Sequence, residues 1–263
     1  MLRKRIIFTL IYSDGFFTQS RNFRLQKVGD LGWLEKHYQF QRISFSIDEL
    51  IILNASKNAK ATTDFASVVS QLTTNVFIPV AVGGGIRTAE DAALLFKNGA
   101  DKIVLNSALA NNPRLVKILI EHYGAQSVIA SIDYKHHDGI NEVFILDGTE
   151  KIDYLLNDYI QYVADLGVGE IYLNSIDQDG TGFGYDFYTI NDIKNLINIP
   201  LIIAGGAGNV RHLQQGLQTE AIHAVATANL FNFLGDSLPN ARKIMLDAGM
   251  NVATTNEVSK WNL

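Results

Sequence analysis

Glycine-rich turns are the first residues of this sequence whose type and spacing point to chemistry. Three such turns occur, at 83–85, 179–182 and 205–208. Glycine lets backbone N–H groups approach an anion closely, and a helix that begins after the turn adds partial positive charge. The turns therefore predict sites for phosphate groups. Tight strand-to-helix connections also need glycine, so any single turn is open to that plainer interpretation.

An internal repeat relates two of these turns. Segment 78–109 aligns without a gap with segment 199–230, at an offset of 121 residues (199 − 78). Each copy has small or polar residues after its next strand, which favours one phosphate site per copy and a substrate with a phosphate at both ends. The residues expected to bind it are Gly85, Asn106 and Ser107 in the first copy, Gly206, Thr227 and Ala228 in the second, and Asp179 and Gly180 in the remaining turn.

Asp133 is the strongest candidate for acid–base catalysis. It ends an apolar strand-like run, so its carboxyl group is expected at the mouth of the site, where apolar neighbours raise a carboxyl pKa. A structural aspartate that accepts bonds from backbone amides is the alternative. The repeat places Ile11 at the equivalent position of the first half, at an offset of 122 (133 − 11), so Asp133 has no symmetric carboxylate partner. Asp14 is a candidate substitute, although turn formation in Ser-Asp-Gly explains it equally well.

Four charged residues begin otherwise apolar strands. They are Arg5, Glu49, Lys102 and Glu170. Because the amino ends of parallel strands meet on one face of a barrel, two positive and two negative side chains are expected there as a closed ring. That face usually serves stability, so a salt-bridge cluster is one interpretation. A plug or gate over the lower end of the barrel is the other.

The elements that must position these residues alternate between strand and helix. Four strand–helix units in each half predict eight units in all, which matches a (β/α)8 barrel built from two duplicated half-barrels. An open doubly wound sheet is the alternative. We expect one domain over 1–263, with half-barrels at approximately 1–122 and 123–250. Segment 12–30 is expected to be a long loop that forms a lid, and 134–152 to be an insertion with two short strands.

Composition excludes several classes of function. The chain has 263 residues and a net charge of −5, with no basic cluster longer than Arg3 to Arg5, so nucleic acid is not an expected ligand. No run approaches the roughly 20 apolar residues of a membrane span, and no signal-peptide pattern is evident, which predicts a cytoplasmic protein. There is no cysteine, and the six histidines lack metal-ligand spacing. We therefore expect no metal and no cofactor.

Several motifs together carry a family resemblance. The stretches KRII, VGGGIRTAEDA, GADKIVLNS, IDYK and SIDQDGTGFGYD, with the later Gly-Gly-Ala-Gly turn, resemble the cyclase subunit of imidazole glycerol phosphate synthase over nearly the whole chain. The resemblance implies a lyase of the glutamine amidotransferase type that forms imidazole glycerol phosphate and AICAR in histidine biosynthesis. It further implies a heterodimer with a class I glutaminase, whose ammonia crosses the barrel through a gate formed by Arg5, Glu49, Lys102 and Glu170.

The chain departs from that family at three positions. The resemblance implies a catalytic aspartate at position 11, a lysine at position 19 and a threonine at position 81, where this chain has Ile11, Gln19 and Ala81. Three hypotheses follow. The chain is the synthase subunit; or it is a paralogous subunit that delivers ammonia for amidation or amidination of a nucleotide sugar in surface polysaccharide (LPS O-antigen) biosynthesis; or it is a non-catalytic activator of its glutaminase.

Overall fold

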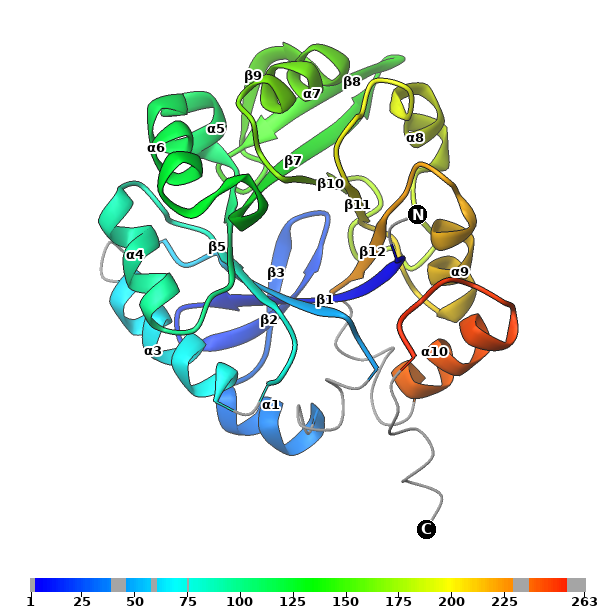
Figure 1. Cartoon of the computed structure of the whole chain (residues 1–263), viewed down its shortest axis with the longest axis horizontal. Helices are drawn as coiled ribbons and strands as arrows, with labels where there is room; N and C mark the ends of the chain where they lie inside the picture. The colour runs from blue at the N-terminus through cyan, green and yellow to red at the C-terminus, as the bar shows by residue number, and fades with distance from the viewer. Residues whose placement is uncertain (1–2, 39–45, 58–60, 75, 229–236, 255–263) are drawn as a thin grey trace.

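The chain folds as a closed barrel of parallel strands. In the computed structural model, which describes residues 3–38, 46–57, 61–74, 76–228 and 237–254, the strand order is β10-β11-β12-β1-β4-β5-β6-β7, and β7 also pairs with β10. This pairing closes the ring (Figure 1), confirms the predicted (β/α)8 fold and rules out an open sheet. The barrel strands are β1 (Arg5–Ser13), β4 (Glu49–Asn54), β5 (Val80–Gly83), β6 (Lys102–Leu105), β7 (Val128–His137), β10 (Glu170–Ser175), β11 (Leu201–Ala204) and β12 (Ala224–Thr227).

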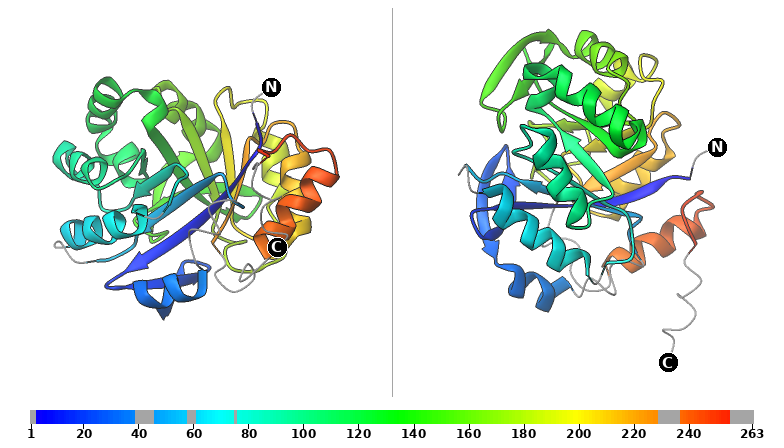
Figure 2. Two further views of the ribbon diagram at one scale, coloured as in Figure 1. Left: turned by 60° about the horizontal axis from the view of Figure 1, so that its bottom comes forward. Right: turned by 60° about the vertical axis from the view of Figure 1, so that its left-hand side comes forward.

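Helices cover the outside of the ring of strands, as the three orientations in Figures 1 and 2 show. They lie between successive barrel strands in the sequence, the arrangement that a right-handed strand–helix–strand unit produces. The described helices are α1 (Leu31–Tyr38), α3 (Ala61–Thr73), α4 (Ala89–Lys97), α5 (Ser107–Asn111), α6 (Pro113–Tyr123), a short 3₁₀ turn (Ala125–Ser127), α7 (Leu156–Asp165), α8 (Phe187–Ile193), α9 (Val210–Gln218) and α10 (Ser237–Asp247).

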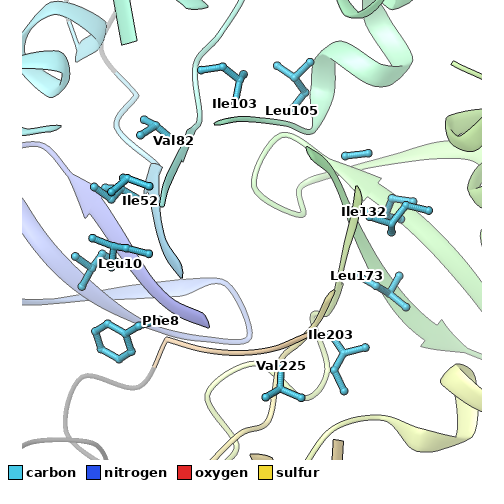
Figure 3. Packing of buried hydrophobic residues seen from close by; sticks show 14 of the residues in the cluster. Phe8, Leu10, Ile52, Val82, Ile103, Leu105, Ile132, Leu173, Ile203 and Val225 are labelled. Carbon is cyan, nitrogen blue, oxygen red and sulfur yellow. The ribbon is translucent and has the colours of Figure 1, made fainter. Parts of the chain in front are cut away.

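Each barrel strand divides its side chains between two environments. On β1, Ile6, Phe8 and Leu10 belong to the cluster packed between strands and helices, whereas Ile7 belongs to a second cluster inside the barrel. Figure 3 shows the outer set pointing away from the barrel interior. Each fully buried side chain of this size contributes about 1.5–3 kcal/mol. The alternation is strict because successive strand residues face opposite sides, and it decides which residues can reach the site.

Segment 12–30 was expected to be a long loop, but it instead forms a β-hairpin. β1 continues to Ser13, and β2 (Phe16–Arg21) and β3 (Arg24–Gly29) follow as antiparallel strands. The turn before β2 has two left-handed residues, Asp14 (φ 47°) and Gly15 (φ 90°), which is the two-residue Asp-Gly turn that matches the twist of a hairpin. The expectation was wrong because this turn signal was read as part of a loop.

The insertion after β7 forms the second hairpin, and here the prediction of two short strands is confirmed. β8 (Ile140–Ile145) and β9 (Glu150–Leu155) extend the sheet in antiparallel fashion from β7. The turn between them contains three consecutive left-handed residues, Leu146, Asp147 and Gly148, with φ of 51°, 57° and 72°. Both hairpins therefore leave the barrel at the carboxyl ends of its strands.

A buried arginine fastens the last helix to the barrel. Arg242 on α10 is 2% exposed, and its guanidinium pairs with the Asp48 carboxylate at 2.7 Å. It also donates to the carbonyl groups of Ser46 (3.1 Å) and Ala253 (2.7 Å). The same Asp48 carboxylate accepts a hydrogen bond from the Ile6 backbone N–H at 2.8 Å. This cluster connects α10 with the start of both β1 and β4. It therefore joins the last described helix to the first strands of the barrel.

We predict that Arg242→Met destabilises the protein, because it leaves the Asp48 charge without its partner in a mostly buried position. The expected loss is about 3–5 kcal/mol of unfolding free energy, as for other broken buried ion pairs. Urea denaturation measures it. Arg211→Met, at an exposed position of α9, is the control and should change the unfolding free energy by less than about 0.5 kcal/mol. An unaltered midpoint for Arg242→Met would contradict the prediction.

Candidate active site

One cavity of about 830 Å³ opens at the carboxyl ends of the barrel strands. This is the face on which barrels of this class build their sites, and the volume suits a sizeable small molecule. Side chains of β1 and both hairpins contribute to its wall, together with the loops after the other strands. Asp133 and every residue that the sequence predicted to bind substrate line it: Gly85, Asn106, Ser107, Asp179, Gly180, Gly206, Thr227 and Ala228.

The two repeat-related turns have the same backbone form. Gly84 and Gly85 have φ of 92° and 73°, and Gly205 and Gly206 have φ of 88° and 100°. A side chain on Gly84 or Gly206 would collide with neighbouring backbone, which by itself requires glycine at those two positions. A side chain on Gly85 would meet nothing within 4 Å. The backbone at Gly85 is therefore open to the cavity, as an anion site needs.

Asp133 lies on the inward-facing side of β7, near the end of its pairing with β10, and is 7% exposed. Its carboxylate accepts hydrogen bonds from two side-chain amides, Asn106 (3.0 Å) and Asn174 (3.1 Å). Burial raises the pKa of Asp133 to about 7, against the opposing hydrogen bond from Asn174 and with help from the charges of Asp147 and Asp179. A carboxyl group with this pKa can both donate and accept a proton at neutral pH, which suits a general acid–base catalyst.

Asn106 and Ser107 are already engaged in a polar network beside Asp133. The Asn106 amide donates to the Ser131 carbonyl at 3.0 Å as well as to Asp133, and its oxygen accepts the Ser107 hydroxyl at 3.3 Å. The Ser107 hydroxyl in turn accepts the backbone N–H of Leu146 at 3.3 Å. Asn106 therefore positions the catalytic candidate, a task that the repeat alone did not indicate.

Asp179 holds the first hairpin over the cavity. Its carboxylate accepts hydrogen bonds from the Ser20 hydroxyl (2.5 Å) and the Phe23 backbone N–H (3.0 Å). Its carbonyl group accepts a further bond from the Asn22 backbone N–H at 3.0 Å. Burial raises the pKa of Asp179, with the Phe23 and Ser20 bonds opposing. Sequence reasoning missed Ser20, which lies 159 residues from its partner.

Sequence reasoning also missed the charged residues that the loops bring into the cavity. Lys57 follows β4 and Arg87 follows β5, and these are the two cationic side chains among the described residues that line it. Asp147 enters from the β8–β9 turn. The available signal was position, because residues just past the carboxyl end of a barrel strand face the site. Both cations belong to the first half, so the two ends of the cavity differ in charge.

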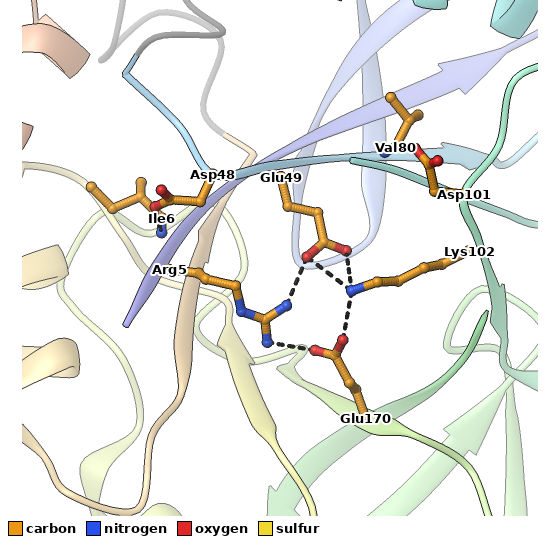
Figure 4. A network of polar contacts seen from close by, with 8 residues as sticks. All are labelled: Arg5, Ile6, Asp48, Glu49, Val80, Asp101, Lys102 and Glu170. Carbon is orange, nitrogen blue, oxygen red and sulfur yellow. Dashed lines mark hydrogen bonds and ion pairs between the residues drawn. The ribbon is translucent and has the colours of Figure 1, made fainter. Parts of the chain in front are cut away.

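At the opposite end of the barrel, the four predicted charges form a closed ring (Figure 4). Arg5 pairs with Glu49 at 2.7 Å and with Glu170 at 2.5 Å. Lys102 pairs with Glu49 at 3.0 Å and with Glu170 at 2.6 Å. Burial raises the pKa of Glu49 against the opposing cations. For Glu170 burial also acts upward, but the bonds from Arg5 and Lys102 outweigh it and lower the pKa.

Two aspartates adjacent to the ring hold its strands in register. Asp48 accepts the Ile6 backbone N–H and Asp101 accepts the Val80 backbone N–H, both at 2.8 Å (Figure 4). Two residues further along each strand from the ring, the inward positions are Ile7, Ile51, Val104 and Tyr172. The Tyr172 hydroxyl lies 3.3 Å from the Thr9 hydroxyl, and both residues line the cavity floor. An apolar layer thus separates the charged ring from the cavity.

Comparison with known proteins assigns the chain to a family. Residues 24–235 match the family described as histidine biosynthesis protein. The chain belongs to this family. A relative from Parasynechococcus marenigrum is 44% identical over 92% of this chain and 90% of its own length, and is provisionally named imidazole glycerol phosphate synthase subunit hisF2. Two proteins named imidazole glycerol phosphate synthase subunit HisF are also similar. The Pyrobaculum aerophilum protein is 36% identical (90% of this chain, 92% of the relative), and that of an Exiguobacterium species is 35% identical (90% and 89%).

Within the described ranges, no three His, Asp or Glu side chains gather closely enough to hold a metal ion. Over the same ranges no helix combines the length and apolar character needed to cross a bilayer.

The raised pKa of Asp133 predicts that this member of the histidine biosynthesis family loses stability as pH rises. The folded state binds the Asp133 proton with a pKa of about 7 and the unfolded chain with one near 3.8, so the stabilising protonation is complete below the lower value and gone above the higher. Asp133→Asn lacks this titration. Its unfolding free energy relative to the wild type should therefore rise between about pH 5 and about pH 8, as measured by urea denaturation. If the difference in unfolding free energy between Asp133→Asn and the wild type is the same at both pH values, the raised pKa of Asp133 is refuted.

Proposed function

We propose that the chain is the synthase subunit of an imidazole glycerol phosphate synthase. In this role it uses ammonia from a glutaminase partner to convert a bis-phosphorylated ribonucleotide derivative into imidazole glycerol phosphate and AICAR. Membership of the histidine biosynthesis family and the names of its relatives support this role. The class of reaction is that of a cyclising lyase of the glutamine amidotransferase type, and we place it in the cytoplasm.

The observation that carries the proposal is the position of Asp133 within one cavity. It lies between the two repeat-related turns, with Gly85 on one side and Gly206 on the other, all lining the same space. A substrate with a phosphate at each end would be anchored at both turns, with its reacting centre near the Asp133 carboxyl group. Lys57 and Arg87 add positive charge at the first-half end, where phosphate would be paired most strongly.

The proposed chemistry follows from that geometry. As ammonia forms a bond to an electrophilic carbon of the substrate, its nitrogen becomes acidic and loses a proton. Asp133, with its pKa near neutrality, accepts that proton when ionised and returns one to the departing group when protonated. The amides of Asn106 and Asn174 hold the carboxylate in place through both steps.

Ammonia would enter from the opposite face. The ring of Arg5, Glu49, Lys102 and Glu170 spans the amino end of the barrel, directly below the apolar layer. In the proposed heterodimer the glutaminase docks on this face and releases ammonia at the ring. Lys102 has a long, flexible side chain that is held by ion pairs to both glutamates, and we propose that it moves aside while the other three stay in place.

Three departures from the family pattern bear on the identity of the acceptor. Ile11 and Gln19 line the cavity where the family resemblance implies an aspartate and a lysine, and Ala81 lies inside the barrel where it implies a threonine. The changes at Ile11 and Gln19 alter the substrate end, whereas Ala81 lies beside Lys102 of the ring, and all four ring residues are retained. Ile11, Gln19 and Ala81 are the residues on which a second candidate rests, namely the same ammonia delivery to a nucleotide sugar in surface polysaccharide biosynthesis. A non-catalytic activator of the glutaminase is the third candidate.

The decisive experiment is an ammonia-dependent synthase assay on the purified chain with the bis-phosphorylated ribonucleotide. We expect product with the wild type and, for Asp133→Asn, a rate about 10²–10⁴-fold lower, the usual contribution of one general acid–base group. Asp192→Asn, at an exposed position on α8, is the control and should keep full activity. Failure of the wild type, with glutamine turnover only when a sugar-modifying partner is present, would support the second candidate. Equal activity of Asp133→Asn would indicate the activator.

We predict that Lys102→Ala uncouples the two half-reactions in the complex with the glutaminase. Removing one cation leaves Glu49 and Glu170 each with a single partner and opens the ring, so ammonia would escape or fail to enter. The ratio of glutamate formed to synthase product should rise above one, as measured by parallel assays of both products. Lys117→Ala, on the exposed surface of α6, should leave that ratio unchanged. An unaltered ratio for Lys102→Ala would count against the gate.

A further inference from the structure

The tip of the β8–β9 hairpin is fastened over the cavity by contacts from two other parts of the chain. The Leu146 backbone N–H donates to the Ser107 hydroxyl at 3.3 Å, and the Thr149 hydroxyl donates to the Leu146 carbonyl at 2.5 Å. The Phe23 ring from the β2–β3 turn packs against Gly148, where an added side chain would meet it at 2.7 Å. The tip is therefore held in one position between the first hairpin and the loop after β6.

This position directs Asp147 into the cavity. Asp147 lines the same space as Asp133, in a left-handed conformation (φ 57°) between two other left-handed residues. Aspartate is one of the few residues with a side chain that tolerates this backbone well. Asp147 is an exposed residue that lines the cavity, so it can exchange protons with water.

Asp147 interacts electrostatically with a lysine and with the catalytic candidate Asp133. Lys57, on the loop after β4, attracts its carboxylate, and this attraction opposes the rise in the pKa of Asp147 that partial burial produces. The charge of Asp147 in turn raises the pKa of Asp133, together with that of Asp179 on the loop after β10. Two carboxyl groups that line one cavity can take the distinct roles of an acid and a base.

We propose that Asp147 is the second proton-transfer group of this site and supplies the carboxylate that position 11 lacks. The inference rests on the proposed function and deepens it. In place of Asp133, ionised Asp147 takes the proton lost by the attacking nitrogen, so that Asp133 stays protonated until it gives its proton to the departing group. One proton is gained and one is released in each turnover. Water at the cavity mouth then removes the proton from Asp147 and restores that of Asp133.

The first test is a titration that does not depend on substrate. ¹³C-carboxyl NMR of aspartate-labelled protein follows the pKa of Asp133 in the wild type, in Asp147→Asn and in Asp138→Asn. Asparagine also tolerates a left-handed backbone. Asp138 is a matched control because it too is a left-handed aspartate in a hairpin turn (φ 49°), but its exposed carboxylate pairs weakly with His137 away from the cavity. Asp147→Asn should lower the pKa of Asp133 and Asp138→Asn should leave it unchanged; no shift with Asp147→Asn would overturn the proposal.

The second test uses the ammonia-dependent assay. Asp147→Asn should lower kcat about 10²-fold or more, with a smaller change in KM, and should move the alkaline limb of the kcat profile to lower pH because Asp133 then loses its proton earlier. Asp147→Glu, which keeps the carboxylate, should recover part of the rate. Full activity and an unmoved limb in Asp147→Asn would reject the role of Asp147 while leaving the synthase assignment intact. An inactive wild type whose Asp133 still responds to Asp147 in the titration would reject the acceptor and retain the carboxyl pair.

Discussion

The closure of eight parallel strands into one ring is the constraint on which the rest of this structure depends. Once β7 pairs with both β6 and β10, every inward position has a fixed height along the barrel axis. On β1 the inward side chains pass in order from the charged ring (Arg5) through the apolar layer (Ile7) and the cavity floor (Thr9) to the cavity wall (Ile11). A strand can therefore contribute to both ends of the barrel at once, with a dry layer between them.

The two ends treat buried charge in opposite ways. At the amino end each carboxylate has two cationic partners, which oppose the rise that burial causes in the pKa of Glu49 and outweigh it for Glu170. At the carboxyl end Asp133 is equally buried but is met by neutral amides, and its pKa rises to about 7. A buried charge that is paired with opposite charges contributes to the structure. A buried carboxyl group without a counter-ion has a raised pKa and titrates near neutral pH. The same fold thereby supports a stable closure and a reactive group.

The hairpins contribute the variable part of the site. Both are additions to the barrel, and each is attached through contacts with remote loops: Asp179 holds Ser20 of the first, and Ser107 holds Leu146 of the second. Because the barrel strands do not depend on these segments for their own pairing, residues there can change with little effect on the fold. Gln19 and Asp147, which lie on the two hairpins and line the cavity, are placed where such changes would alter substrate chemistry.

Much of this arrangement could be predicted from the sequence, for a definite reason. The repeat between 78–109 and 199–230 and the continuous apolar strands indicate a duplicated barrel. In such a barrel the first and last residues of each strand must lie on opposite faces, so the four ring charges and Asp133 could be assigned to their ends. The ends of a strand can be recognised from the local sequence. Closure of the barrel then fixes at which end of the barrel each of them lies.

The remaining features depend on contacts between segments that no local pattern connects. The hairpin over 16–29 was read as a loop, and the bond from Ser20 to Asp179 joins residues 159 positions apart. The entry of Lys57, Arg87 and Asp147 into the cavity depends on how their loops fold over it. The sequence by itself determined the barrel and the face on which each charged strand end lies, because strand periodicity and glycine turns are encoded locally. Only the tertiary structure decided the pKa of Asp133 and the charges around it, because desolvation and Coulomb interactions depend on every neighbour that folding brings within reach.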